Sequence, residues 1–255
     1  MTHILAVANQ KGGVGKTTTS INLGAYLAKL GQRVLIVDLD PQGNSSSGLA
    51  IAKNQLSATV YNVLVEGVAA EQVIQQTSVK NMDVLPANSV LAAAELELSQ
   101  QQQREFQLRR ALGGVTDRYD FILIDCPPSL GLLTLNGLVA ATHLLIPVQS
   151  EYFALEGLGQ LLATVKRVRQ ALNPQLVLLG VVITMHASRT SLAAQVQGEL
   201  RHHFPDTLFE TIIPRNIRLA EAPSHGKPIN QYDRFSKGAQ SYKRLAKEVL
   251  QRVSK

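Results

Sequence analysis

The chain has 255 residues, of which 45% are hydrophobic and 17% are charged, so it can form one buried core and is not an intrinsically disordered chain. Its single cysteine, Cys126, excludes an intrachain disulfide and a metal site of four thiolates from one chain, and it favours a reducing compartment. No apolar run approaches the ~18 residues of a membrane-spanning helix and no leader segment opens the chain, so we expect a cytoplasmic protein.

The net charge of +6 is distributed unevenly along the chain. Residues 1–200 hold 14 basic and 14 acidic residues, whereas residues 201–255 hold 11 basic and 5 acidic ones. A basic segment on a neutral body is typical of a protein that binds a polyanion. The same charges are equally compatible with the solvated face of a C-terminal helix, so charge alone leaves both interpretations open.

Short apolar runs alternate with amphipathic segments from one end of the chain to the other. The apolar runs predict buried strands at 3–9, 33–38, 82–85, 121–125, 143–148 and 176–184. The amphipathic segments predict helices at 17–30, 57–65, 88–112, 155–172, 191–203 and 236–253. The turn-rich stretch 40–48 predicts a loop. This order predicts one α/β domain over residues 1–255, with a mostly parallel twisted sheet and helices on both of its faces.

A glycine-rich segment connects the first predicted strand to the first predicted helix, as a phosphate-binding loop of a P-loop NTPase does. Glycines let backbone N–H groups converge on an anion, and the N-terminus of a helix adds partial positive charge. We expect the Lys16 ammonium to reach the β- and γ-phosphates of ATP and the Thr17 hydroxyl to ligate Mg²⁺. The predicted ATP-binding residues of this segment are Lys11, Gly12, Gly13, Val14, Gly15, Lys16, Thr17 and Thr18.

Three carboxylates follow buried strands. Asp38 and Asp40 come at the carboxyl end of the second strand, where positions two apart share one face. Asp125 ends the run FILID in the manner of a Walker B strand, whose carboxylate holds Mg²⁺ directly or through water. Asp38 and Asp40 could instead cap the loop that follows them. For Cys126 we expect a small buried filler rather than a reactive thiol.

Several motifs resemble those of a known family. The segment KGGVGKTT is similar to the deviant Walker A motif of the ParA/MinD group, although Gln10 stands where the standard pattern has glycine. The segments LTLNGL, PVQSEYFALEGL and IPRNIRLAEAPSHGKPI resemble those of ParA/Soj partition ATPases, and the resemblance covers nearly the whole chain. It implies a slow ATPase that forms an ATP-dependent homodimer, in which Lys11 crosses to the nucleotide of the partner.

The resemblance also assigns further roles to individual residues. Asp40 would position the attacking water, and Asp38 would belong to the water shell of Mg²⁺. Pro214 would pack on the adenine, and Asn216 would form a hydrogen bond with its edge.

A ParA/Soj protein would bind double-stranded DNA without sequence preference, and the resemblance marks Arg189 and Arg218 as its DNA-contacting residues. Such phosphate contacts depend strongly on salt. The resemblance further implies association with the nucleoid and an activating ParB-like centromere-binding protein. Since the first strand begins near residue 3, we expect no N-terminal helix-turn-helix domain.

Two other members of the wider group remain as alternatives. A MinD-like division-site ATPase is held on the membrane by a C-terminal amphipathic helix. The last predicted helix has one apolar stripe, formed by Tyr242, Leu245, Ala246, Val249, Leu250 and Val253. Because this stripe lacks Trp and Phe, we expect it to pack on its own domain and expect no membrane partner. A metal-cluster carrier like the nitrogenase iron protein needs two cysteines per subunit. This chain has one, which argues strongly against that alternative.

Overall fold

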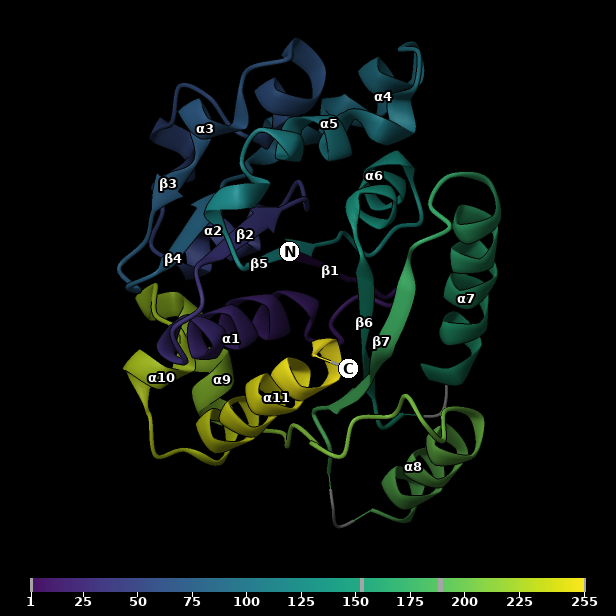
Figure 1. Cartoon of the computed structure of the whole chain (residues 1–255). Helices are drawn as coiled ribbons and strands as arrows, with labels where there is room; N and C mark the ends of the chain where they lie inside the picture. Colours follow the sequence, from purple (N-terminus) through teal and green to yellow (C-terminus); the bar gives the residue numbers. More distant parts are fainter. Residues whose placement is uncertain (1, 152–153, 188–189, 255) are drawn as a thin grey trace.

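The computed structural model describes residues 2–151, 154–187 and 190–254 (Figure 1). Its centre is a seven-stranded sheet in the order β3-β4-β2-β5-β1-β6-β7. The strands are β1 (His3–Val7), β2 (Val34–Asp38), β3 (Gln75–Gln76), β4 (Met82–Leu85), β5 (Phe121–Asp125), β6 (His143–Gln149) and β7 (Val177–Thr184). All neighbouring strands are parallel except β3 and β4, so the predicted mostly parallel sheet is confirmed.

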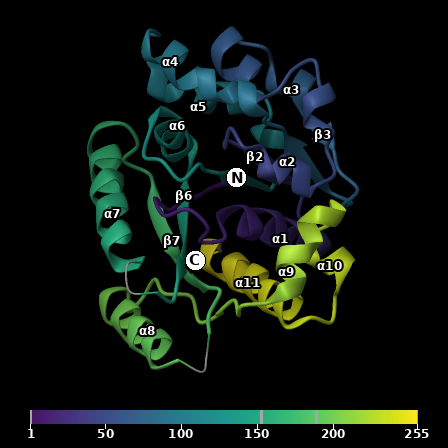
Figure 2. The same cartoon turned by 180° about the vertical axis from the view of Figure 1, so that it is seen from behind.

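Helices cover both faces of this sheet, as predicted (Figures 1 and 2). One face carries α1 (Lys16–Lys29), α9 (Ile217–Glu221), α10 (Ile229–Tyr232) and α11 (Lys237–Val253). The other carries α5 (Gln107–Gly113), α6 (Leu132–Ala140), α7 (Ala154–Ala171) and α8 (Ser191–His203). The short helices are α2 (Asn44–Gly48), α3 (Ala70–Val73) and α4 (Ala94–Ser99). Single helical turns occur at Lys53–Gln55, Asn62–Glu66, Ser89–Ala93, Arg104–Phe106, Thr116–Arg118 and Ala222–His225.

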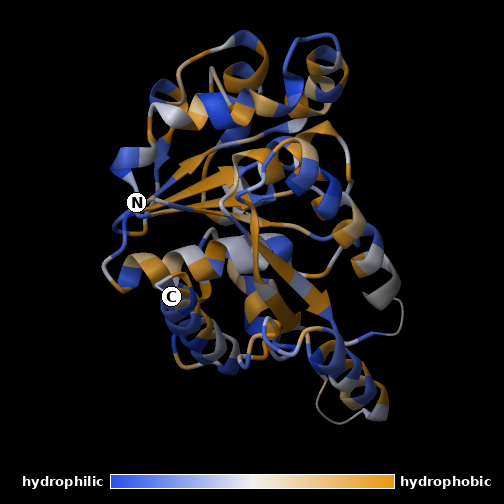
Figure 3. Cartoon of the chain, turned by 45° about the vertical axis from the view of Figure 1, so that its right-hand side comes forward, coloured by the Kyte–Doolittle hydropathy of each residue, from blue (hydrophilic) through white to orange (hydrophobic). Residues whose placement is uncertain are grey.

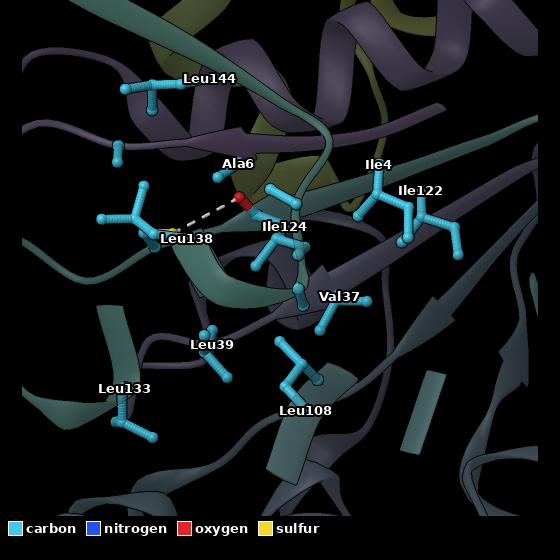
Figure 4. Close-up of a cluster of buried hydrophobic side chains, with 14 of the residues drawn as sticks. Ile4, Ala6, Val37, Leu39, Leu108, Ile122, Ile124, Leu133, Leu138 and Leu144 are labelled. Carbon is cyan, nitrogen blue, oxygen red and sulfur yellow. Dashed lines mark hydrogen bonds between the residues drawn. The ribbon is translucent and has the colours of Figure 1, made fainter. Parts of the chain in front are cut away.

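The alternation of side chains along β1 explains why the sheet has a core on each face. Ile4 and Ala6 point into the cluster beneath α5 and α6, which Figure 4 shows in close-up. Leu5 and Val7 point into the cluster beneath α1 and α11. Successive side chains of a strand face opposite ways, so a strand that is buried on both sides must be apolar throughout. Figure 3 shows the consequence: a hydrophobic sheet lies inside helices whose outer surfaces are hydrophilic.

Three expected elements differ from the structure. The stretch 40–48 is a loop only in its first half, because Gly43 takes a left-handed φ of 58° and starts α2. The expected helix at 88–112 is broken into a turn, α4, a second turn and α5, with Gln103 in the left-handed region at the break. Of the expected helix at 57–65, residues 57–59 are not helical, and the helical turns span residues 60–66.

Helix α6 had no counterpart among the predicted elements. Its sequence LLTLNGLVA is apolar on nearly every side, because the helix is buried between the sheet and its neighbours. A helix of this kind lacks the polar face that produces a 3.6-residue pattern. Its place above β1 and β5 is therefore a product of the tertiary structure.

The final helix packs on its own domain, as expected. Tyr242, Leu245, Ala246 and Val249 are buried, and α11 lies along α1. The Tyr242 hydroxyl lies 3.1 Å from the Thr19 hydroxyl in this buried contact. Within residues 2–151, 154–187 and 190–254, we find no helix with the length and apolar character needed to span a bilayer.

Candidate active site

The phosphate loop occupies the turn between β1 and α1. Gly13 and Gly15 adopt positive φ values of 73° and 85°, a region in which a side chain would strain the backbone. Gly15 directly precedes α1, and as a glycine it has no side chain to cap the N–H groups at this end of the helix. Uncapped N–H groups and the helix dipole together favour an anion at this position. The local sequence alone predicted this geometry.

Side chains at the ends of two strands hold the loop in place. The Gln149 amide at the end of β6 donates to the Gly13 carbonyl at 2.7 Å. The Thr184 hydroxyl at the end of β7 donates to the Val14 carbonyl at 2.8 Å. These contacts fix loop carbonyls and leave the N–H groups available for an anion. The sequence interpretation missed both residues, although each is a polar residue at the end of a predicted apolar strand.

The two lysines of the loop have different surroundings. Lys16 is buried, and its ammonium donates to the Lys11 carbonyl at 3.2 Å. Burial lowers the pKa of Lys16, whereas the charges of Asp125 and Asp40 act in the opposite direction. The Lys11 ammonium instead forms an ion pair with Glu151 at 2.7 Å, and these side chains are 32% and 49% exposed. Lys16 therefore lies within the loop, while Lys11 lies on the surface.

Asp38 and Asp125 stand side by side, because β2 and β5 are adjacent and pair these two residues at their ends. Both carboxylates are fully buried, and burial is the main cause that raises the pKa of each. The Ser45 hydroxyl donates to Asp125 Oδ2 at 2.8 Å, and the Ser46 hydroxyl donates to Asp38 Oδ2 at 2.7 Å. Asp38 thus holds the loop that follows it, in keeping with the alternative interpretation of this residue.

Asp40 lies just beyond the end of β2 and is partly exposed. Its Oδ1 accepts from the Gln42 amide at 2.9 Å. The charge of Asp40 contributes to the raised pKa of Asp125 and opposes the effect of burial, which lowers the pKa of Lys16. A partly exposed carboxylate at the end of a strand has room to contact water or substrate.

The donor set around α1 suits Mg²⁺. The Thr17 hydroxyl at the start of α1 and the Asp125 carboxylate at the end of β5 supply hard oxygen atoms. Mg²⁺ is usually held by one or two protein oxygens together with water and substrate phosphates, so it needs no larger cage of side chains. The residues present therefore fit this ion.

A pocket of about 400 Å³ begins at the phosphate loop and extends toward α9. Gly15 and Thr18 form one end, and Pro214 and Asn216 form the other. Its lining is mostly apolar, as is usual for a pocket that receives a flat aromatic ring. The Asn216 Oδ1 accepts from the Leu219 amide at 3.3 Å, so this side chain also caps α9. Segments about 200 residues apart in the sequence thus form one nucleotide-sized cleft.

Comparison with known proteins identifies the family. A family model described as an AAA domain matches residues 2–178. The sporulation initiation inhibitor protein Soj of Bacillus subtilis is 55% identical, with 98% of each chain covered. The chromosome-partitioning ATPase Soj of Treponema pallidum is 53% identical, with 99% of this chain and 98% of that protein covered. The chain belongs to the ParA/Soj family of P-loop ATPases.

A solved structure extends this comparison. The cobyrinic acid a,c-diamide synthase of Mycobacterium smegmatis, crystallised with an ATP analog and magnesium, is 40% identical. Its TM-score is 0.88, and the match covers 100% of this chain and 96% of that one. A ParA/Soj-type fold and a structural relative that binds nucleotide with magnesium agree with the cleft described above.

Of the two DNA-contacting arginines implied by the resemblance to ParA/Soj, one is described. The Arg218 side chain is 54% exposed and forms ion pairs with Glu221 at 2.9 Å and Asp233 at 3.6 Å. Arg189 lies outside the described residues. Arg218 is therefore accessible at the surface, and a phosphate would compete with two carboxylates for it.

Proposed function

We propose that this ParA/Soj-family ATPase is a DNA-partitioning switch that acts on the nucleoid. ATP closes a homodimer, the dimer binds duplex DNA without sequence preference, and hydrolysis releases it. Hydrolysis is slow until a ParB-like centromere-binding protein stimulates it. One observation supports the nucleotide part of this proposal: the pocket that Pro214 and Asn216 line is also lined by Gly15 and Thr18, at the N-terminus of α1 next to the buried Lys16.

The residues of the cleft have separate tasks in this scheme. The Lys16 ammonium exchanges its contact with the Lys11 carbonyl for the phosphates of ATP and stabilises the charge that develops on them. Asp40 positions the attacking water, since its carboxylate is partly exposed just beyond the end of β2, next to Asp38. Pro214 and Asn216 hold the adenine in the apolar pocket.

Thr17 would ligate Mg²⁺, and Asp125 and Asp38 would hold its water shell. The bound ion would neutralise phosphate charge as the terminal phosphate leaves. The burial of both carboxylates fits this role, because a buried carboxylate is most stable in its charged form when a cation is near.

Lys11 supplies charge to the nucleotide of the partner subunit. To do so it must leave Glu151, with which it pairs at the surface. An exposed pair of this kind stabilises a structure by only about 0.2–1 kcal/mol, so breaking it is a small barrier to dimerisation. The pair holds Lys11 at the rim of the loop, from which a partner subunit can be reached.

DNA binding rests on the basic segment 201–255, which includes Arg218, and on Arg189. Each subunit alone offers few phosphate contacts. A dimer presents two such surfaces on one rigid body, and simultaneous contact raises the affinity without any new contact type. Because the contacts release counterions, binding should weaken steeply with salt.

Two other activities are less well supported. A MinD-like membrane ATPase would need the apolar stripe of α11, which is buried against α1. The Mycobacterium smegmatis relative is named for a synthase activity, but this chain is only 40% identical to it. This chain is 55% and 53% identical to the two Soj proteins. Similarity and packing thus both favour the partition ATPase.

The proposal is tested by binding to random-sequence duplex DNA and to anionic vesicles, with ATP, with ADP and without nucleotide, over a series of salt concentrations. We expect DNA binding that requires ATP and falls steeply with salt, and no binding to vesicles. ATP-dependent vesicle binding without DNA binding would replace the proposal with the MinD-like one. DNA binding of equal affinity with ATP, with ADP and without nucleotide would contradict the proposed ATP-dependent switch.

A further inference from the structure

We propose that Ser45 and Ser46 are positioning residues, which hold the two strand-end carboxylates and the Asp40 loop in the arrangement that hydrolysis needs. The inference rests on the ATPase function proposed above. Asp38 and Asp125 are buried side by side at the ends of β2 and β5. Buried carboxylates need hydrogen-bond donors, and helix α2 supplies them to both.

Ser45 determines which oxygen of Asp125 remains available. Its buried hydroxyl donates to Oδ2 of Asp125 at 2.8 Å. The other oxygen, Oδ1, lies 3.3 Å from the Ser20 hydroxyl, which also donates to the Lys16 carbonyl at 3.1 Å. A hydroxyl has one proton, so Ser20 cannot satisfy both acceptors fully. Oδ1 therefore keeps free acceptor capacity on the side of α1, where Thr17 would hold Mg²⁺.

Ser46 joins three parts of the fold at one buried atom. Its hydroxyl donates to Asp38 Oδ2 at 2.7 Å and accepts from the Ala87 amide at 3.0 Å, just beyond β4. Its own amide donates to the same Asp38 oxygen at 2.8 Å. One side chain thus connects the ends of β2 and β4 to the start of α2.

The loop that carries Asp40 is short and attached at both ends. At its beginning the Asp40 amide donates to Asp38 Oδ1 at 3.4 Å, and at its end Ser46 holds Asp38 Oδ2. Lys53 donates to the Gly43 carbonyl at 2.9 Å in between. A Cβ on Gly43 would lie 2.5 Å from the Ala87 carbonyl, so the loop also fits closely against its neighbours. Loss of the Ser46 hydroxyl would remove its hydrogen bonds with Asp38 and with the Ala87 amide, and would loosen the end of the loop.

The two serines should therefore have separable effects. Ser45 acts on Asp125 and hence on Mg²⁺, whereas Ser46 acts on the loop of Asp40 and hence on the hydrolysis step. Residues that orient a metal-holding group typically change metal affinity or activity by about 10–100-fold when they are removed. Ser47 is the matched control, because it lies on the same helix but is exposed.

The experiment compares Ser45→Ala, Ser46→Ala and Ser47→Ala in the full chain. ATP hydrolysis is measured against Mg²⁺ concentration, and binding of a fluorescent ADP analogue is measured with and without Mg²⁺. Hydrogen exchange of residues 39–46 is followed in parallel. If Ser46→Ala does not fold, Ser46→Cys takes its place, because a thiol keeps the volume and donates weakly.

We expect Ser45→Ala to raise the Mg²⁺ concentration for half-maximal hydrolysis by about tenfold with a smaller change in kcat, and to leave ADP binding without Mg²⁺ unchanged. Ser46→Ala should lower kcat by about tenfold, leave the Mg²⁺ requirement within about twofold, and speed exchange at 39–46. The inference is overturned if both variants match Ser47→Ala. If the wild-type chain hydrolyses no ATP, the proposed function is wrong. The binding of the ADP analogue with and without Mg²⁺ and the hydrogen exchange of residues 39–46 would then test the positioning roles of Ser45 and Ser46.

Discussion

Arg252 near the end of α11 offers a sharp test of what holds the last helix on the sheet edge. Its guanidinium donates to the carbonyls of Leu179, Thr207 and Leu208 at 3.1, 3.0 and 2.7 Å. It also donates to Glu248 at 3.0 Å and lies 3.9 Å from the centre of the Phe209 ring. The side chain is only 19% exposed. One residue therefore joins β7, the following segment and α11.

The expected cost of Arg252→Ala follows from these contacts. A hydrogen bond to a charged group contributes about 1.5–3 kcal/mol, and a cation over an aromatic ring contributes about 0.5–2 kcal/mol. Water can enter the open pocket of about 1150 Å³ that this arginine lines and replace part of what is lost. We therefore expect the free energy of unfolding to fall by about 2–4 kcal/mol, a decrease in Tm of about 4–16 °C.

The assay is thermal and urea unfolding followed by circular dichroism, since the chain has no tryptophan. Arg244→Ala is the matched control, because Arg244 is exposed on the same helix. Its loss should change the free energy of unfolding by no more than about 0.5 kcal/mol. Equal stability of the two variants would refute the inference that the Arg252 contacts hold α11 on the sheet edge.

Four further changes test the cleft and its surface. Lys16→Ala should abolish detectable ATP binding in a fluorescent-nucleotide titration, and normal affinity would contradict the assignment of the phosphate loop. Asp40→Ala should trap an ATP dimer on DNA in a sedimentation assay, whereas brisk hydrolysis would exclude its assigned role. Glu151→Gln frees Lys11 from its ion pair. It should strengthen ATP-dependent dimerisation by no more than about thirtyfold, because each of the two subunits breaks one exposed pair of at most about 1 kcal/mol; a weaker dimer would mean that Glu151 serves the dimer itself. Arg218→Glu should weaken DNA binding at matched salt and leave the ATP dimer intact, and unchanged affinity would remove Arg218 from the DNA surface.

The local sequence by itself determined the phosphate loop and most of the sheet. A strand, a glycine cluster and a helix follow one another within residues 3–29, so their geometry depends on neighbours that the sequence already places together. The same holds for Asp125 at the end of β5, because an apolar run that stops at a carboxylate marks a strand end. The resemblance to ParA/Soj, carried by motifs along nearly the whole chain, added the family, which the comparisons confirm.

Only the tertiary structure decided which of these elements meet. The pairing of Asp38 with Asp125 requires β2 and β5 to be neighbours, although 82 residues lie between β2 and β5 in the chain. Ser45 and Ser46, predicted to lie in a loop, lie in α2 and donate to those two buried carboxylates. The pocket between Gly15 and Asn216 likewise depends on packing between distant segments. Periodicity and turn chemistry describe a residue's own surroundings along the chain, whereas burial and hydrogen bonding across the fold depend on partners that no local pattern contains.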